Sequence, residues 1–451
     1  TVYDIEVGDV HEYVAGGIVT HNTGRLSCLS HDALVHTRQG LVPIVDITEE
    51  HDIEVSPNKF AKAKLVHTGE QDFVKIVMSS GKKIECTTDH RFLCPSDEGF
   101  VWRYARDLKV SDMLCRTPVT FTGCDINFEM FVYGFFLGDG SYYSKESKNK
   151  YSLRMFFCEK DHDAMMYIHD GLVVRGIPHS MRPCKDSLWV IELAKEGSRR
   201  LSEMFPVENV KQSERRVDFS YIHSKVDAFS VLAGVYQAEG EKYIRPDDGK
   251  MNSTLNVTSY ALVQSLQRLA DYVGIRTKIH TIKIDQVKHP THRKQWRLQF
   301  CVKSFRKYLD NSIPFRINTK KDVPKFLTDS LNTLPKDVWK VGERAKFKAM
   351  YHNKRYSLYS VMRLCEYSEL PIEVFDYEQV VSIEPCGKKE AYTLSVDDPL
   401  HRYIAEGFIH HNCGGDKKNS FFTQNNVQST PKPHSLMVKG RKATQEEIDQ
   451  G

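Results

Sequence analysis

The sequence lacks the features that mark membrane and secreted proteins. Among its 451 residues, no apolar run approaches the roughly 20 residues that a membrane-spanning helix needs. The first residues, TVYDIEVGDV, contain neither the basic nor the apolar segment of a secretory signal peptide. The 11 cysteines are odd in number and form no Cys-x-x-Cys pair, so neither a disulfide framework nor a zinc knuckle is indicated. We therefore expect a cytoplasmic monomer without a membrane partner.

A strong net charge is also absent, because the whole chain carries only +4. This mild average conceals a basic stretch, since residues 276–325 contain 14 Lys or Arg against 3 Asp, with aromatic residues interleaved as in HRKQWRLQF. Such a density of cations is what contacts with DNA phosphates need, although a solvated charged face is the alternative. The cations that we expect to bind DNA are Arg276, Lys278, Lys283, Arg293, Lys294 and Arg297.

The two ends of the chain carry the same short segment. A shift of 390 positions aligns residues 11–22 with residues 401–412, with His, Tyr, Ala, Gly, His and Asn at the same places. Just upstream, VYDIEV corresponds to AYTLSV. Each copy predicts two strands joined by a short turn, followed by His-Asn and then by Thr23 or Cys413.

The His-Asn ending has a specific chemistry. An Asn side-chain amide can attack its own backbone carbonyl, which forms a succinimide and breaks the chain after the Asn. A neighbouring His411 can donate a proton to the leaving amine. The thiol of Cys413 can receive an acyl group. A lone His-Asn-Cys tripeptide usually has no chemistry, but two copies in the same strand context favour a cleavage site.

A matching nucleophile lies just after the first copy. Cys28 opens the strand-turn-strand pattern CLSHDALVHTRQGLVPIVDI, and further along Thr87 and His90 form a T-x-x-H within GKKIECTTDHRFLC. A hydroxyl and an imidazole three residues apart on a turn can polarise one peptide bond. A buried cysteine and a loop histidine are the ordinary structural alternatives for each residue alone. Together the three residues favour chemistry at the bond between Ser27 and Cys28.

These segments resemble the first, second and last splicing blocks of an intein with the all-β, horseshoe-shaped Hint fold. The resemblance covers both ends of residues 28–412. It implies that Cys28 makes an N-to-S acyl shift, and that Thr87 and His90 activate the Ser27–Cys28 bond.

The same resemblance implies the later steps of splicing. Cys413 receives the chain by transthioesterification, Asn412 cyclises with help from His411 and His401, and an S-to-N shift joins the flanking segments. These steps need no cofactor and act on the chain's own flanking exteins. A Hint domain that cleaves without ligating is the alternative, against which Cys413 argues.

Two features depart from one complete intein. Thr393 stands where many inteins carry Asp or Cys, and where the first copy has Asp4, so the coupling of the two cleavages is an open question. Residues 1–22 resemble the tail of a different, upstream intein whose body is missing. The residues left there for a reaction are His21, Asn22 and Thr23.

The span from 28 to 412 is longer than a bare splicing domain needs, and two segments inside it match each other. FVYGFFLGDGSYY ends near Asp139 and SVLAGVYQAEGEKY ends near Glu239, 100 residues later. Their Gly and Ala residues predict two helices in close contact. The two acids would then emerge side by side, where their repulsion calls for a divalent cation. Two ordinary core helices with capping acids are the alternative.

The paired segments resemble the two LAGLIDADG motifs of a single-chain homing endonuclease. This resemblance implies an α/β domain of two α-β-β-α-β-β-α repeats whose sheets form a saddle over double-stranded DNA. Asp139 and Glu239 would hold Mg²⁺ ions that activate water. Lys195 and Lys303 fit the catalytic lysine positions of the family, although surface lysines are usually only solvated. A DNA-binding saddle that has lost cutting is the alternative function.

Joining TGRLS to CGGDKKNSFFTQNNVQSTPKP across the intein gives a stretch similar to family A DNA polymerases. The catalytic aspartates of that family lie outside this chain, so no polymerase activity is expected.

The fold class is therefore mixed, an all-β Hint domain interrupted by an α/β endonuclease. Residues 326–375 are basic and predict helix, either as an accessory DNA-binding piece or as a linker. The predicted divisions are 1–22 (upstream intein tail), 23–27 (extein), 28–125 (Hint, first part), 126–325 (endonuclease), 326–375 (extension), 376–412 (Hint, second part) and 413–451 (extein).

Overall fold

The structure is a computed structural model. It describes residues 27–96, 99–117, 125–145, 150–158, 161–184, 188–193, 195–206, 210–244, 251–282, 294–300 and 375–412, with the short strands 12–15, 18–21, 437–438 and 441–442. In this part of the chain no helix is long and apolar enough to cross a membrane. The predicted residues that lie outside it are Asn22, Thr23, Lys283, Arg293, Lys303, Cys413 and nearly all of 326–375.

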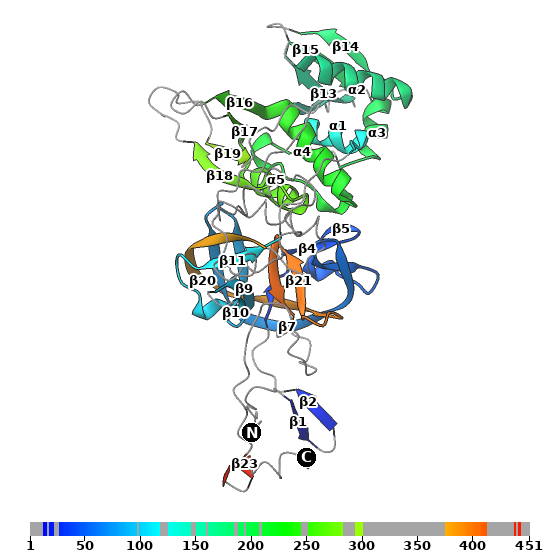
Figure 1. Cartoon of the computed structure of the whole chain (residues 1–451). Coiled ribbons are helices and arrows are strands. Elements are labelled where there is room, and N and C mark those ends of the chain that lie inside the picture. Colours follow the sequence, from blue (N-terminus) through cyan, green and yellow to red (C-terminus); the bar gives the residue numbers. More distant parts are fainter. Residues whose placement is uncertain are drawn as a thin grey trace, which may run out of the picture.

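The two ends of the 28–412 span fold together into one antiparallel 12-stranded sheet, which forms the body in the middle of Figure 1. Its strands are β3 (Leu29–Ser30), β4 (Leu34–Thr37), β5 (Gly40–Pro43), β6 (Asp52–Ser56), β7 (Lys59–Met78), β8 (Lys83–Thr87), β9 (Arg91–Pro95), β10 (Phe100–Tyr104), β11 (Met113–Arg116), β20 (Asp376–Val396), β21 (Arg402–Ala405) and β22 (Phe408–His411). The long strands β7 and β20 pair from Ala63↔Val396 to Met78↔Val380, with three register shifts. The sheet is closed by residues more than 300 positions apart in the sequence.

The inserted domain begins and ends at neighbouring points of this sheet. Arg116, the last residue of β11, is the register partner of Asp376, the first residue of β20. Because the chain leaves and returns at one place, a large domain can be inserted without stretching the strands on either side. The insertion lies on one side of the splicing sheet (Figure 1).

Within the insertion two halves have the same topology. The first contains α1 (Phe128–Asp139), β12 (Gly140–Lys145), β13 (Lys150–Phe157), α2 (His162–Val174), β14 (Ser180–Pro183), β15 (Trp189–Leu193) and α3 (Lys195–Ser202). The second contains α4 (Lys225–Glu239), β16 (Gly240–Ile244), β17 (Met251–Val257), α5 (Tyr260–Tyr272), β18 (Thr277–Ile282) and β19 (Gln295–Phe300). Their sheets have the orders β12-β13-β15-β14 and β16-β17-β19-β18, so the two halves correspond strand by strand.

The repeated end segments also fold alike. The strands β1 (Glu12–Ala15) and β2 (Ile18–His21) pair from Glu12↔His21 to Ala15↔Ile18. β21 and β22 pair from Arg402↔His411 to Ala405↔Phe408, which is the same register shifted by 390 residues.

The turn between β21 and β22 carries an acidic residue in an unusual backbone conformation. Glu406 and Gly407 have φ values of 50° and 76°, as a two-residue type I′ hairpin turn requires. A left-handed conformation costs an L-residue about 1–2 kcal/mol. Several contacts compensate: Glu406 Oε1 accepts from the Leu34 N–H at 2.9 Å, its N–H donates to the Leu34 carbonyl at 2.8 Å, its Oε2 lies 3.1 Å from Arg268, and its carbonyl accepts from Lys82 Nζ at 2.7 Å.

Helix α5 of the insertion docks directly on the splicing sheet. Gln267 Nε2 donates to the carbonyl of Ser80 at 3.2 Å, and the Tyr272 hydroxyl donates to the carbonyl of Thr37 at 3.1 Å. The N–H of Ile279 in β18 also donates to the Ser80 carbonyl, at 2.8 Å. The two domains are therefore joined by a backbone hydrogen bond as well as by side-chain contacts.

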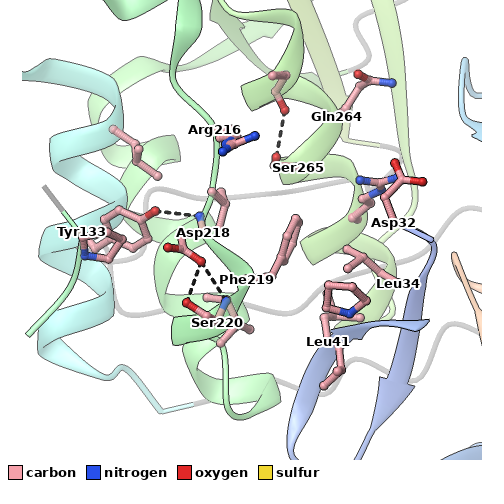
Figure 2. A pocket seen from close by; sticks show the side chains of 18 of the residues that line it. Asp32, Leu34, Leu41, Tyr133, Arg216, Asp218, Phe219, Ser220, Gln264 and Ser265 are labelled. Atoms are coloured by element: carbon pink, nitrogen blue, oxygen red, sulfur yellow. Dashed lines mark hydrogen bonds between the residues drawn. The ribbon is translucent and has the colours of Figure 1, made fainter. Parts of the chain in front are cut away.

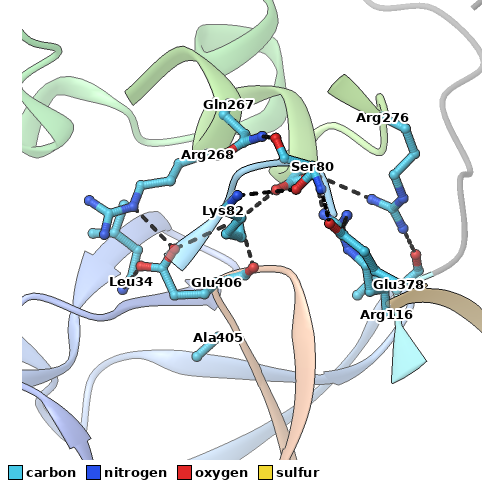
Figure 3. A network of polar contacts seen from close by, with 12 residues as sticks. Leu34, Ser80, Lys82, Arg116, Gln267, Arg268, Arg276, Glu378, Ala405 and Glu406 are labelled. Carbon is cyan, nitrogen blue, oxygen red and sulfur yellow. Dashed lines mark hydrogen bonds and ion pairs between the residues drawn. The ribbon is translucent and has the colours of Figure 1, made fainter. Parts of the chain in front are cut away.

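A network of charges lies between the two domains (Figure 3). Asp271 at the end of α5 forms an ion pair with Lys82, whose Nζ lies 2.5 Å from Asp271 Oδ2, and also pairs with Arg116. Arg276 Nε lies 2.7 Å from Asp376, and Arg116 pairs with Glu378. Of the eight charged residues in this network only Arg268 is partly exposed, with 28% of its side chain accessible, so each buried charge depends on a partner of opposite sign.

This network corrects one part of the predicted DNA surface. Arg276 is only 6% exposed, and its guanidinium contacts Asp376 and the carbonyl of Thr117. Its charge is neutralised inside the protein, where a DNA phosphate does not reach.

Removing Asp271 should destabilise the docked state. In a splicing-blocked chain (Cys28→Ala with Asn412→Ala), Asp271→Asn leaves Lys82 and Arg116 short of a buried anion, which we expect to cost about 3–5 kcal/mol of unfolding free energy. Guanidinium unfolding followed by circular dichroism measures the loss. Asp163→Asn on the exposed face of α2 is the matched control and should change stability by less than about 0.5 kcal/mol. Equal unfolding midpoints for the two variants would contradict the prediction.

Candidate functional site

The first centre surrounds the peptide bond between Ser27 and Cys28. Cys28 is fully buried at the start of β3. Its backbone N–H donates to Thr87 Oγ1 at 3.0 Å, and the N–H of Thr87 donates to the Cys28 carbonyl at 3.0 Å. The nitrogen of the bond predicted to break therefore lies beside the Thr87 hydroxyl.

The Cys28 thiol has a partner that the sequence pattern did not reveal. Its Sγ lies 3.3 Å from the hydroxyl of Thr68 in β7, and that hydroxyl donates to the carbonyl of Ala391 at 3.1 Å. Because the Thr68 proton is used for Ala391, the Thr68 oxygen is the acceptor for the thiol proton. Thr68 is held in place by the pairing of β7 with β20, and from there it orients the Cys28 thiol.

His90 directs its ring at the same junction. Its Nδ1 lies 2.9 Å from Ser27 Oγ, which also accepts from the Arg91 N–H at 3.1 Å. The N–H of His90 donates to the Thr87 carbonyl at 3.1 Å, which closes the T-x-x-H turn. Burial holds the pKa of His90 well below its usual range, so the ring is neutral at physiological pH.

The second junction is built around Asn412, which is also fully buried. Its Nδ2 donates to the Val396 carbonyl at 3.0 Å, and its backbone N–H donates to the His401 carbonyl at 2.8 Å. His411 Nδ1 contacts the Asn412 carbonyl oxygen, which can only accept, so the imidazole is the donor. This bond polarises the carbonyl that the Asn412 amide would attack.

His411 donates that hydrogen bond as a neutral ring. Burial lowers the pKa of His411 to about 3. The ring of His401 stacks on it, with 5.9 Å between the centroids and 23° between the planes. His401 itself has a φ of 51°, a left-handed conformation that places its carbonyl against the Asn412 N–H. Backbone strain of this kind is typical of functional sites.

The two junctions meet in space although 384 residues separate them. Ser27 Oγ lies 3.4 Å from the carbonyl oxygen of His411. The predicted residues Cys28, Thr87, His90, His401, His411 and Asn412 therefore gather in one buried centre.

Thr393 does not bridge the two junctions. It is buried in β20 opposite Val66 of β7, and its hydroxyl has no hydrogen-bond partner among the residues that the structure describes.

His410 is a second residue that the sequence pattern missed. Its Nδ1 lies 2.7 Å from His90 Nε2, and its own Nε2 donates to the Ala405 carbonyl at 2.8 Å. The sequence did contain a clue, since the first copy of the repeat has Thr20 at the position of His410.

The second centre is formed by the pair of helices α1 and α4. A Cβ at Gly134 would lie 2.1 Å from the Val231 carbonyl oxygen, and one at Gly234 would lie 2.1 Å from the Phe131 carbonyl oxygen. Such contacts are impossible for any residue larger than glycine. The small residues therefore allow the close helix approach that the sequence predicted.

Both helices run in the same direction, which brings their acidic ends together. Near their first turns, Asn127 Nδ2 donates to Asp227 Oδ1 at 2.8 Å. At the other end, burial and the Asp139 carboxylate raise the pKa of Glu239 to about 7. Two carboxylates thus lie at adjacent helix C-termini, where the helix dipoles are also negative.

Arg215, from the segment between the two halves, caps this end of α1. Its Nη1 donates to the carbonyls of Leu137 at 2.9 Å and Gly138 at 3.1 Å, and its Nη2 donates to that of Gly140 at 2.6 Å. Its charge partly offsets that of the carboxylates and lowers the pKa of Glu239 against the effect of burial.

The segment around Arg215 also borders a cavity of about 730 Å³ between the two domains (Figure 2). Side chains from β4, α1 and α5 line this cavity together with those of the segment, and its chemistry is mixed. The carboxylate pair is not part of the lining.

The carboxylate pair fits a hard divalent cation that keeps some external ligands. Carboxylate oxygens are the ligands that Mg²⁺ and Ca²⁺ prefer. Among the described residues no three His, Cys, Asp or Glu side chains form a metal cage. Water or phosphate oxygens would complete the coordination, as in sites that act on nucleic acids.

Lys195 is an exposed residue that begins α3, beyond the end of β15. The strand register places Gly140, which follows Asp139, level with Met155 and Ile191 of the same sheet.

Three of the predicted DNA-binding cations lie on the second sheet. Lys278 and Lys294 are exposed, and Lys294 Nζ lies 4.4 Å from the ring centre of Trp296. Arg297 Nε donates to Asn256 Oδ1 at 3.0 Å. A polar face of β17, β18 and β19 is therefore available for contacts with a polyanion.

Comparison with known families identifies the family to which the chain belongs. The family model of the intein splicing domain matches residues 35–412, and the chain belongs to this family. Among solved structures, a variant of the Ssp DnaB mini-intein is 10% identical over 85% of this chain and 92% of its own, with a TM-score of 0.27. The structure of I-DmoI in complex with DNA and Ca is 14% identical over 38% of this chain and 82% of its own, also with a TM-score of 0.27. At such scores neither likeness defines the arrangement of the whole chain.

Because several histidines are buried, we predict that the folded protein becomes less stable as the pH falls. Burial lowers the pKa of His410 to about 4, of His411 to about 3, and of His90 well below its usual range. In the unfolded chain these histidines have a pKa near 6.5, so below that pH the unfolded chain binds protons that the folded chain does not. The free energy of unfolding is therefore highest above pH ~6.5 and decreases as the pH falls toward ~4. Each histidine contributes about 1.4 kcal/mol per pH unit in this window.

Denaturant midpoints of the splicing-blocked chain between pH ~7.5 and ~4.5 test this prediction. We expect them to fall with pH, and His410→Gln should reduce the slope by about one proton. Midpoints that stay constant across this range would show that the rings are not held neutral.

Proposed function

We propose that residues 28–412 excise themselves and ligate Ser27 to Cys413. The observation that carries this proposal is the meeting of both junctions in one buried centre, with Ser27 Oγ 3.4 Å from the His411 carbonyl oxygen. Splicing requires that an acyl group pass from one junction to the other, and such a transfer needs this proximity.

In the first step the Cys28 thiol attacks the Ser27 carbonyl carbon. The bond from that carbon to the Cys28 nitrogen breaks, a thioester forms, and the thiol proton ends on the freed amine. Thr68 orients the thiol, Thr87 lies at the leaving nitrogen, and the neutral His90 can carry the proton between them.

The later steps use the second junction. The Cys413 thiol attacks the thioester and releases the Cys28 thiol. The Asn412 amide nitrogen then attacks the Asn412 carbonyl, breaks the bond to Cys413 and forms a succinimide. His411 stabilises the charge that develops on that carbonyl oxygen. The freed Cys413 amine finally attacks its own thioester, which restores a peptide bond.

Expression of the full chain tests the splicing proposal. We expect mass spectrometry to find the free 28–412 segment and a ligated product of 1–27 with 413–451. The Cys28→Ala, Asn412→Ala chain should remain intact, because both the first nucleophile and the cyclising amide are gone. Cleaved flanks without a ligated product would instead support the autoprocessing alternative.

We further propose that the insertion is a LAGLIDADG homing endonuclease, composed of two α-β-β-α-β-β-α repeats. The topological match of its two halves and the paired carboxylates at the ends of α1 and α4 support this proposal. When bound, Mg²⁺ would supply a Lewis acid and an activated water. Asp139 and Glu239 would hold it, while Lys278, Lys294 and Arg297 would contact the DNA backbone. Lys195 and Lys303 keep their proposed catalytic roles only by resemblance.

The DNA substrate follows from the flanks. The proposed target is an intein-less gene for a family A DNA polymerase, in which the coding sequences of 23–27 and 413–451 are continuous. Residues 1–22 are proposed to be the tail of another intein, with His21, Asn22 and Thr23 at its junction.

A plasmid that carries this joined sequence tests the endonuclease. We expect linearisation with Mg²⁺, loss of cutting with a chelator, and loss of cutting in Asp139→Asn and in Glu239→Gln. DNA binding by these variants in a gel shift with Ca²⁺ should persist, because the basic face is unchanged, and Asp163→Asn is the surface control. Binding without cutting under any divalent cation would favour the alternative of an inactive DNA-binding saddle.

A further inference from the structure

The ring of His410 is fixed in place from several sides. Strand β22 carries it next to β9, where His410 pairs with Phe92. Its ring lies 5.1 Å from the ring of Phe92 and stacks on that of Tyr403 at 5.4 Å and 27°. His410 is fully buried, so water does not compete for its nitrogens.

The hydrogen bonds of His410 determine the tautomer of His90. The Ala405 carbonyl can only accept, so His410 Nε2 carries a proton and its Nδ1 is an acceptor when the ring is neutral. His410 Nδ1 must then accept from His90 Nε2, which therefore carries the proton of that ring. The remaining nitrogen, His90 Nδ1, is left unprotonated and accepts from the Ser27 hydroxyl at 2.9 Å, which is much closer than the His411 carbonyl oxygen at 3.4 Å from the same hydroxyl. If His410 carried its proton on Nδ1 instead, the lone pair of its Nε2 would face the lone pairs of the Ala405 carbonyl oxygen.

The two copies of the terminal repeat differ at a pair of positions. The first copy has Asp4 and Thr20, whereas the second has Thr393 and His410 at the corresponding places. In the second copy the Thr393 hydroxyl has no hydrogen-bond partner among the described residues, while the His410 ring reaches His90. The link between the two junctions therefore runs through β22 in this copy.

We propose that His410 is a positioning residue for the first step of splicing, which keeps His90 in the tautomer that presents an unprotonated Nδ1 to the Ser27–Cys28 junction. This inference rests on the proposed splicing function. Because His410 lies two residues before Asn412 on the same strand, His90 is correctly oriented only when the C-terminal hairpin is seated. The cleavage at Cys28 thus depends on β22, the strand that leads into Asn412, where the last cleavage takes place.

Separate measurement of the two cleavages tests this role. In the Asn412→Ala background, thiol-induced release of the N-terminal flank reports the acyl shift at Cys28. In the Cys28→Ala background, release of the C-terminal flank reports Asn412 cyclisation. His410→Leu removes the acceptor for His90, and we expect the first rate to fall by at least about tenfold, as for other residues that orient an imidazole. The second rate should fall by a smaller factor.

A conservative variant and a spectroscopic measurement separate positioning from folding. His410→Asn keeps an acceptor oxygen near the place of Nδ1, and should recover most of the first rate. Nitrogen-15 chemical shifts should show His90 protonated on Nε2 in the splicing-blocked chain, and a loss of this preference in His410→Leu.

The outcomes distinguish the two proposals. If the parental chains release neither flank, the splicing function fails. If they release both flanks and His410→Leu leaves the first rate unchanged, splicing stands and the role of His410 is overturned. Equal slowing of both releases, with no recovery in His410→Asn and an unchanged His90 tautomer, would also overturn it.

Discussion

The pairing of β7 with β20 is the constraint on which the rest of the molecule depends. These strands come from opposite ends of the splicing domain, and their ladder brings Ala391 and Tyr392 beside the first residues of the domain, Ser30 and Leu29. Cys28 is thereby held at the edge of β20, with Thr68 of β7 at its thiol. The ladder ends at Val380↔Met78, and β20 extends beyond it to Asp376, which pairs with Arg116 of β11 where the insertion leaves and returns. One strand pair thus holds the reacting junction, and a different strand pair carries the insertion.

Burial has opposite consequences in the two centres. In the splicing centre it keeps His90, His410 and His411 neutral, so that each ring can have one donor and one acceptor nitrogen. At the ends of α1 and α4 burial raises the pKa of Glu239, and the neighbouring Asp139 carboxylate raises it further. Arg215 is the nearby positive charge that lowers it. The first environment favours proton transfer between neutral groups. The second favours the entry of a cation.

Features that depend on residues close in sequence could be predicted, whereas contacts between residues far apart in the sequence could not. The terminal hairpins, the T-x-x-H turn and the glycine-lined helices each depend on residues close in sequence, and the structure contains all of them. Arg276 was assigned to DNA because its partner Asp376 is 100 residues away and not visible in a charge count. His410 escaped notice for a similar reason, since its role depends on the pairing of β22 with β9. Thr68 is identified only by the register of β7 with β20.

The charges between the two domains show how closely the insertion has become part of the splicing domain. The splicing side contributes Lys82, Arg116, Asp376, Glu378 and Glu406, with a net charge of −1, and the insertion contributes Arg268, Asp271 and Arg276, with a net charge of +1. Neither surface is satisfied alone, because a buried charge without its partner carries a large desolvation cost.

Glu406 gives this complementarity a consequence for the reaction. It occupies the strained turn of the hairpin that carries His410, His411 and Asn412, and one of its stabilising contacts comes from Arg268 of the insertion. The hairpin turn is thus held in part by the added domain. Through this contact the insertion supports the hairpin whose second strand carries His410 and His411.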